Sequence, residues 1–147
     1  IHNHCTNSDY EFWASYGQTF SNFLNGCASR EWGNAEKTSQ CLLNDPMNKL
    51  SESCATCFGD YQACAQGECW FQCGWDSTSN WCLKCIDGSE CPGELTTCSG
   101  YESANLPPKP NGSIEGLPTN ANEIITTSST TPMMSTVAVP SGNCTST

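Results

Sequence analysis

Residues 54–73 read CATCFGDYQACAQGECWFQC, and this stretch decides the fold. Cys54, Cys57 and Cys64 recur at helical steps, which place the three sulfur atoms on one face of a helix. The next two cysteines lie four residues apart and also share a face. Alternation typical of strands is absent, so the stretch predicts short helices that carry their cysteines in rows.

Cysteines are dense well beyond this stretch. The chain has 147 residues and 13 cysteines, nine of them between positions 54 and 98. Such density indicates a disulfide framework formed in an oxidising compartment, and a core of this size needs that bracing. We predict a small, disulfide-rich, mainly α fold in which disulfides join the helices. The cysteines assigned to disulfides are Cys5, Cys27, Cys41, Cys54, Cys57, Cys64, Cys69, Cys73, Cys82, Cys85, Cys91 and Cys98.

Two Cys-x2-Cys pairs, 54/57 and 82/85, leave zinc as an alternative. The two pairs are farther apart than the roughly 15–20 residues typical of paired zinc knuckles. Three other cysteines lie between them. Zinc also needs thiolates, which an oxidising compartment converts to disulfides. We therefore expect disulfides and no metal site.

An odd cysteine count leaves one sulfur without a partner in the same chain. Cys144 lies far from every other cysteine. One interpretation leaves it unpaired or bonded to another chain. In the other, Cys144 folds back onto the domain and a different cysteine is left over.

Aromatic residues before the cysteine-rich stretch predict another helix. They recur at steps of three and four over about residues 9–28, as expected of a face packed in the core. Ser8 and Glu11 have the spacing of a capping box at its start. Asn44-Asp45-Pro46 predicts a second helix start. Together these elements form a predicted head, residues 1–101, with the cysteine-rich module at 41–101.

Residues 102–147 differ in composition from the head. They hold six of the eight prolines and are rich in Ser and Thr, and the aromatic residues end at Tyr101. Such a segment does not form a core of its own. We predict an extended, irregular arm with short β-prone stretches, which docks on another surface.

The arm also carries glycosylation motifs. Asn111 and Asn143 begin Asn-x-Ser/Thr acceptors. A Ser/Thr run followed by proline predicts O-linked sugars. The residues of that run are Thr126, Thr127, Ser128, Ser129, Thr130 and Thr131.

Charge and hydropathy narrow the function classes. The formal net charge is −10, with only five Lys and Arg, so a surface that binds nucleic acid is not expected. No run of 18 apolar residues is present, which argues against membrane insertion. The first residue is Ile1, and we expect a mature secreted product from which a signal peptide has been removed.

Catalytic chemistry has little support in the sequence. His2 and His4 are the only histidines, and they belong to no nucleophile motif. The acids at 76, 87, 90 and 94 are loosely grouped but lack a calcium-loop pattern. We expect neither catalytic residues nor a cofactor beyond covalent glycans. Tryptophans near positions 70 and 75 suggest core packing, or contact with sugars or a neighbouring subunit.

The cysteine spacing from Cys54 to Cys98, with Cys57-Phe-Gly and Cys98-Ser-Gly, resembles small cysteine-rich modules of secreted and surface proteins of algae, ciliates and other protists. The resemblance ends at Tyr101. It implies an extracellular protein of a eukaryotic microbe with a structural or adhesive role, and it supplies no catalytic residues.

Two functions are therefore expected. In the first, the chain is a protomer of an extracellular, glycosylated filament, flagellar hair or surface coat, built when the arm docks on a neighbouring copy. In the alternative, it is a soluble secreted binding module, similar to an elicitor, toxin or inhibitor, whose arm wraps its own head. The two differ in which chain the arm touches.

Overall fold

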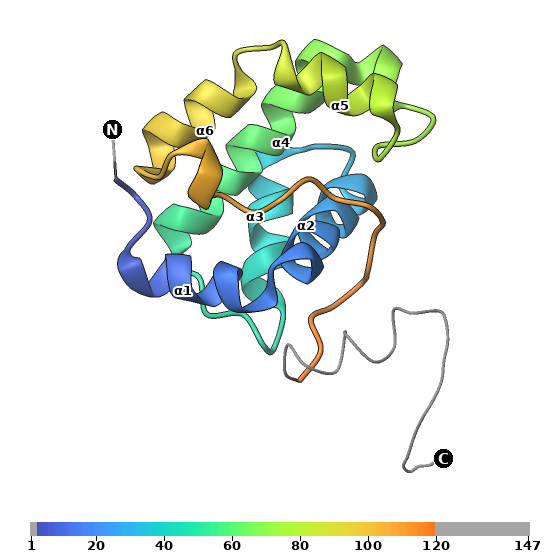
Figure 1. Cartoon of the computed structure of the whole chain (residues 1–147). Coiled ribbons are helices and arrows are strands. Elements are labelled where there is room, and N and C mark those ends of the chain that lie inside the picture. Colours follow the sequence, from blue (N-terminus) through green and yellow to red (C-terminus); the bar gives the residue numbers. More distant parts are fainter. Residues whose placement is uncertain (1–2, 120–147) are drawn as a thin grey trace. The chain divides into compact units, whose positions relative to one another are not determined.

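The computed structural model describes residues 3–119, which form six α-helices and a short 3₁₀ helix without any strand (Figure 1). This confirms the mainly α, disulfide-rich prediction. The β-prone stretches of the predicted arm lie outside the described residues. The helices are α1 (Asn7–Tyr16), α2 (Gln18–Arg30), α3 (Ala35–Asn44), α4 (Glu52–Cys73), α5 (Asn80–Asp87), α6 (Cys91–Ser99) and the 3₁₀ helix η1 (Ser103–Asn105).

The single helix predicted over about 9–28 is wrong, because the chain breaks at Gly17. This glycine has φ 57°, a left-handed value that side chains with a Cβ rarely adopt. The predicted capping box is also displaced. Thr6, and not Ser8, caps α1: its hydroxyl accepts from the Asp9 backbone N–H at 3.2 Å, while the Asp9 carboxyl accepts from the Thr6 N–H at 2.8 Å.

The helix start predicted at Asn44-Asp45-Pro46 is a helix end. Asn44 is the last residue of α3, and the Asp45 side chain then accepts the Met47 N–H at 2.9 Å in a tight turn. The long helix α4 begins later, where the Ser51 hydroxyl accepts from the Cys54 N–H at 3.3 Å. Asp45 therefore stabilises a turn instead of a helix N-terminus.

Helices α5 and α6 return beside α4 (Figure 1). Four nested disulfides join α4 to this pair. Their sequence separations fall in order from 41 through 27 and 16 to 9, because each step forward along α4 is matched by a similar step back along α6 and α5. The pattern is that of an antiparallel helical hairpin. The four pairs are Cys57–Cys98, Cys64–Cys91, Cys69–Cys85 and Cys73–Cys82.

Two further disulfides tie the N-terminal half to this hairpin and to itself. Cys5 bonds Cys54 at the start of α4, and Cys27 of α2 bonds Cys41 of α3. All twelve cysteines assigned to disulfides are thus paired. Cys144, the thirteenth, lies outside the described residues, so its predicted state stays open. Six disulfides suit a secreted protein.

The core is an aromatic cluster between α1, α2 and α4. Trp13, Phe20 and Phe58 are at most 1% exposed. The Phe58 ring meets Trp13 at 5.5 Å and Phe20 at 5.4 Å between centroids, both edge-on. The buried indole of Trp13 donates its N–H to the Asn105 carbonyl at 3.0 Å, which attaches η1 to the core.

The compact unit extends to Leu117 and includes part of the predicted arm. The sequence predicts this boundary after Tyr101. Residues 106–117, here called the strap, run along α2 and end where the Leu117 N–H donates to Asp45 at 3.2 Å. Leu117 itself is 8% exposed and belongs to the core.

Candidate functional site

Helices α2, α4 and α5 and the strap enclose an apolar groove. Its volume is about 690 Å³, which lies within the roughly 300–1,000 Å³ typical of small-molecule sites. The apolar side chains that line it include Leu24, Phe58, Ala65, Leu83, Ile86 and Leu95. Several of these are buried against the core, so the groove has a fixed floor.

Two tryptophans, Trp32 and Trp75, line the groove and remain open to solvent. Their side chains are 83% and 89% exposed, the largest values among the exposed large apolar residues. Trp32 has φ 55° in the turn after α2, an uncommon left-handed value for a bulky residue. Single exposed apolar side chains are common, but these two border the same groove and extend its apolar surface.

The strap forms one wall of the groove because α2 offers it a row of polar side chains. The Ser21 hydroxyl donates to the Pro108 carbonyl. The Asn22 amide donates to the Asn111 side chain and accepts from its backbone N–H, both at 2.9 Å. The Asn25 amide donates to the Gly112 carbonyl at 3.0 Å. These bonds satisfy a polar loop backbone without a sheet.

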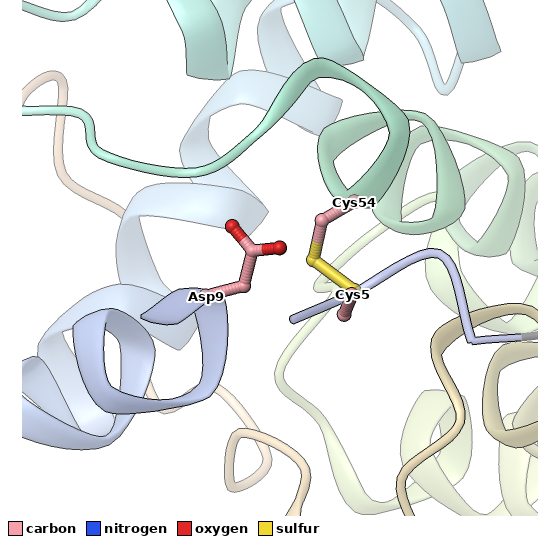
Figure 2. A group of neighbouring side chains, drawn as sticks. All are labelled: Cys5, Asp9 and Cys54. Carbon is pink, nitrogen blue, oxygen red and sulfur yellow. A yellow bond between two sulfur atoms is a disulfide. The ribbon is translucent and has the colours of Figure 1, made fainter. Parts of the chain in front are cut away.

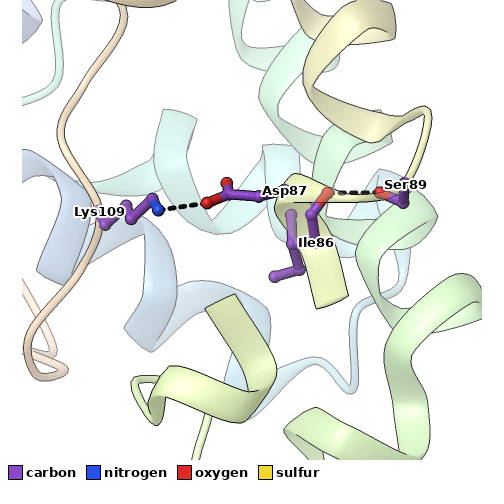
Figure 3. Close-up of polar contacts among 4 residues, drawn as sticks. All are labelled: Ile86, Asp87, Ser89 and Lys109. Atoms are coloured by element: carbon purple, nitrogen blue, oxygen red, sulfur yellow. Dashed lines mark hydrogen bonds and ion pairs between the residues drawn. The ribbon is translucent and has the colours of Figure 1, made fainter. Parts of the chain in front are cut away.

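An ion pair links the strap to α5. Figure 3 shows the Lys109 ammonium on the Asp87 carboxylate, at the C-terminal end of α5. Both side chains are more than half exposed, so the pair contributes at most about 1 kcal/mol. In the same turn the Ser89 hydroxyl donates to the Ile86 carbonyl at 2.6 Å, which ends α5 beside the groove.

Tyr61 of α4 is the titratable side chain in the groove wall with a perturbed pKa. Burial, and then the nearby charge of Asp87, raise the pKa of Tyr61 above its ordinary value. The phenol therefore stays protonated through neutral and mildly alkaline pH. Among the described residues its hydroxyl has no hydrogen-bond partner.

The loose group of acids at 76, 87, 90 and 94 does not form a site in residues 3–119. Asp76 accepts from the hydroxyl and backbone N–H of Thr78, at 2.7 and 2.9 Å. These two bonds lower the pKa of Asp76. Asp87 pairs with Lys109. Asp76 thus stabilises a turn and Asp87 forms an ion pair, so these two acids have separate roles.

Cys5, Asp9 and Cys54 are the one group of potential metal ligands that converges within the described part of the chain (Figure 2). The two sulfur atoms form a disulfide and provide no thiolate. The carboxyl of Asp9 already accepts from Thr6 and Ser51. The four cysteines of the zinc alternative are each in a disulfide with some other cysteine.

A second exposed aromatic cluster lies on the hairpin. The rings of Trp70, Phe71 and Trp81 meet edge-on with centroids 5.7 and 5.5 Å apart, and all three are more than half exposed. None of the three lines the groove. Contact of these tryptophans with sugars or another subunit stays a prediction.

Asn111, the glycosylation acceptor within the described residues, is exposed in the strap. Its side-chain oxygen accepts from Asn22 at 2.9 Å. The Ser113 hydroxyl of the same motif accepts from Asn25 at 2.8 Å. The other predicted acceptors, Asn143 and the run 126–131, lie outside the described residues, as does His2.

Sequence reasoning missed the groove. Its floor consists of ordinary core residues, and its wall is a segment that composition assigned to an arm. Two signals were available. Trp32 and Trp75 lie outside the aromatic pattern of the predicted helix, and α2 carries a row of polar side chains. Each has a simpler explanation.

The groove and the disulfide hairpin define the chain as a disulfide-braced, all-α module with a groove of ligand size. No protein-family model matches it, and neither a curated protein nor a solved structure does. The resemblance to protist cysteine-rich modules therefore stays a prediction. Within residues 3–119, no helix combines the length and apolar character needed to cross a bilayer.

Proposed function

We propose that this chain is a secreted binding module that holds a small apolar molecule in the groove between α2, α4, α5 and the strap. The groove carries the proposal: its volume suits one small ligand, its floor is rigid, and two exposed indoles stand at its rim. Disulfides join α4 to α5, so this side of the groove keeps its shape without a ligand and binding there costs little reorganisation.

The strap supports this function over the filament. The part of the predicted arm that the structure describes bonds to α2 of its own chain. That is the arrangement expected of a secreted binding module. The filament, hair or coat requires residues 120–147 to dock on a neighbouring copy, and it stays a prediction. The extracellular location and the glycans at Asn111 and Asn143 belong to either function.

Binding of Nile red, an uncharged apolar dye, tests the proposal on the full oxidised chain. We expect saturable binding with one dye per chain. Trp75→Ala should weaken it about threefold to tenfold, because one aromatic contact is worth roughly 0.5–1.5 kcal/mol. Trp70→Ala is the matched control: it removes another exposed indole, one that does not line the groove. Absent binding, or equal loss in both variants, contradicts the proposal.

Sedimentation velocity on native chain, with and without reductant, tests the filament. A monomer in both conditions removes the polymer. If one species halves in mass on reduction and is absent from Cys144→Ser, then Cys144 forms an interchain disulfide and the species is a covalent dimer. Polymers that persist in Cys144→Ser would favour docking of the arm and count against the binding module.

A further inference from the structure

The groove has a charge pattern that selects among apolar ligands. Of its lining residues only Asp87 and Lys109 carry a charge, and these two are paired with each other. An anionic head group would find no free cation there and would meet a chain of net charge −10. A cationic head group would have to displace Lys109 before it reached Asp87.

The polar side chains left for a ligand are uncharged, and the phenol of Tyr61 lies among them. The others include Ser29, Gln62, Gln66, Ser77 and Ser103. Tyr61 lines the groove beside apolar and uncharged polar side chains, and within residues 3–119 its hydroxyl makes no hydrogen bond. A half-buried tyrosine hydroxyl normally finds a hydrogen-bond partner. Because burial and Asp87 raise the pKa of this phenol, the hydroxyl keeps its proton and can both donate and accept.

The rim of the groove offers apolar surface to the remainder of a ligand whose polar group meets Tyr61. Trp32 and Trp75 add aromatic surface at the edge of the groove, and the apolar floor continues from them to Phe58. Each methylene transferred from water to such a surface gains about 0.8 kcal/mol. The apolar surface thus favours a hydrocarbon tail.

We infer that the groove takes an uncharged amphiphile with a hydroxyl head, a long-chain alcohol being the simplest member, and that the Tyr61 hydroxyl hydrogen-bonds this head. The inference rests on the proposed function, since it names the ligand class of the same groove. It adds a specificity-determining residue, Tyr61, to a site otherwise defined by shape.

Three ligands with the same tail and different heads test the inference. Dodecanol, dodecanoate and dodecyltrimethylammonium are each used to displace Nile red from the full oxidised chain, the alcohol below its solubility limit and the two ions below their micellar concentrations. We expect the alcohol to bind at least tenfold more tightly than either ion. Tyr61→Phe should weaken the alcohol about threefold to tenfold, the worth of one neutral hydrogen bond, and leave both ions unchanged.

Tyr10→Phe is the matched control, because it removes a phenol that stacks on Tyr101 away from the groove. Binding of Nile red without preference for the alcohol, or with the acid or the ammonium tightest, overturns the ligand class but leaves the proposed function standing. Equal effects of Tyr61→Phe on all three heads overturn the role of the hydroxyl. Failure of Nile red itself to bind refutes the proposed function.

Discussion

The Asp9 carboxyl of α1 accepts the Ser51 backbone N–H at 2.7 Å and the Ser51 hydroxyl at 2.8 Å. Ser51 is the residue that caps α4. The same carboxyl also closes the capping box of α1 with Thr6. One buried acid, 1% exposed, therefore serves the starts of two helices that lie far apart in sequence. It supplements the Cys5–Cys54 disulfide, which joins the same two regions.

Asp9→Ala should lower the free energy of unfolding by about 2–3 kcal/mol, because buried donors of Thr6 and Ser51 lose their acceptor. Urea unfolding with the disulfides intact measures it. Asp60→Ala, which removes an exposed acid of α4, should change stability by less than about 0.5 kcal/mol. Equal losses in the two variants would show that Asp9 does not hold the helix starts.

Two glycines of α4 should respond in opposite directions to alanine. A Cβ on Gly59 would lie 2.3 Å from the Ala35 carbonyl oxygen, so Gly59→Ala forces α3 and α4 apart. We expect a loss of about 1–3 kcal/mol. A Cβ on Gly67 meets nothing within 4 Å, and Gly67→Ala should stabilise the helix by about 0.5–1 kcal/mol. Thermal unfolding of both variants checks the pair, and a stable Gly59→Ala protein would contradict the close approach.

The sequence predicted the mainly α class and the cysteines that form disulfides, because cysteines at helical spacing constrain both. It could not predict the pairing, since the nested order depends on α5 and α6 returning antiparallel to α4. The break at Gly17 was missed because the aromatic face continues across it. The strap was missed for a different reason: Ser21 and Asn25 look like solvent-facing residues, yet they bind backbone carbonyls, which every residue carries.

The raised pKa of Tyr61 predicts both a late titration and a pH-dependent stability. The folded chain holds this proton at a pH where the unfolded chain releases it. The free energy of unfolding should therefore be constant below the ordinary tyrosine pKa and fall as pH rises above it. Tyr61→Phe should remove that fall.

Phenolate absorbance measured over pH checks the Tyr61 prediction directly. The phenolate absorbance that appears at the highest pH should be missing in Tyr61→Phe. In Asp87→Asn it should move to lower pH without reaching the ordinary value, because burial is the larger cause. A Cys144→Ser background prevents a free thiolate from attacking the disulfides. Unchanged titration curves in both variants would contradict the groove environment assigned to Tyr61.

Glycosylation at Asn111 is the prediction that links the strap to a secretory route. Asn111 is exposed and Ser113 completes the motif, so the chain produced by a eukaryotic secretory cell should carry a glycan there. Asn111→Gln and, independently, Ser113→Ala should each reduce the intact mass by one glycan. Asn105→Gln, an exposed asparagine outside any such motif, should leave the mass of the glycans unchanged.

A glycan at Asn111 would also have a structural consequence, because the Asn111 side-chain oxygen accepts from Asn22 and its backbone N–H donates to Asn22. The sugar attaches to the amide nitrogen, which leaves both bonds in place. We therefore expect the glycosylated and the enzymatically deglycosylated chains to bind Nile red equally, within about twofold, since neither bond that holds the strap depends on the sugar. A large gain in dye binding on deglycosylation would mean that the glycan covers the groove, and the strap would then regulate access instead of only forming a wall.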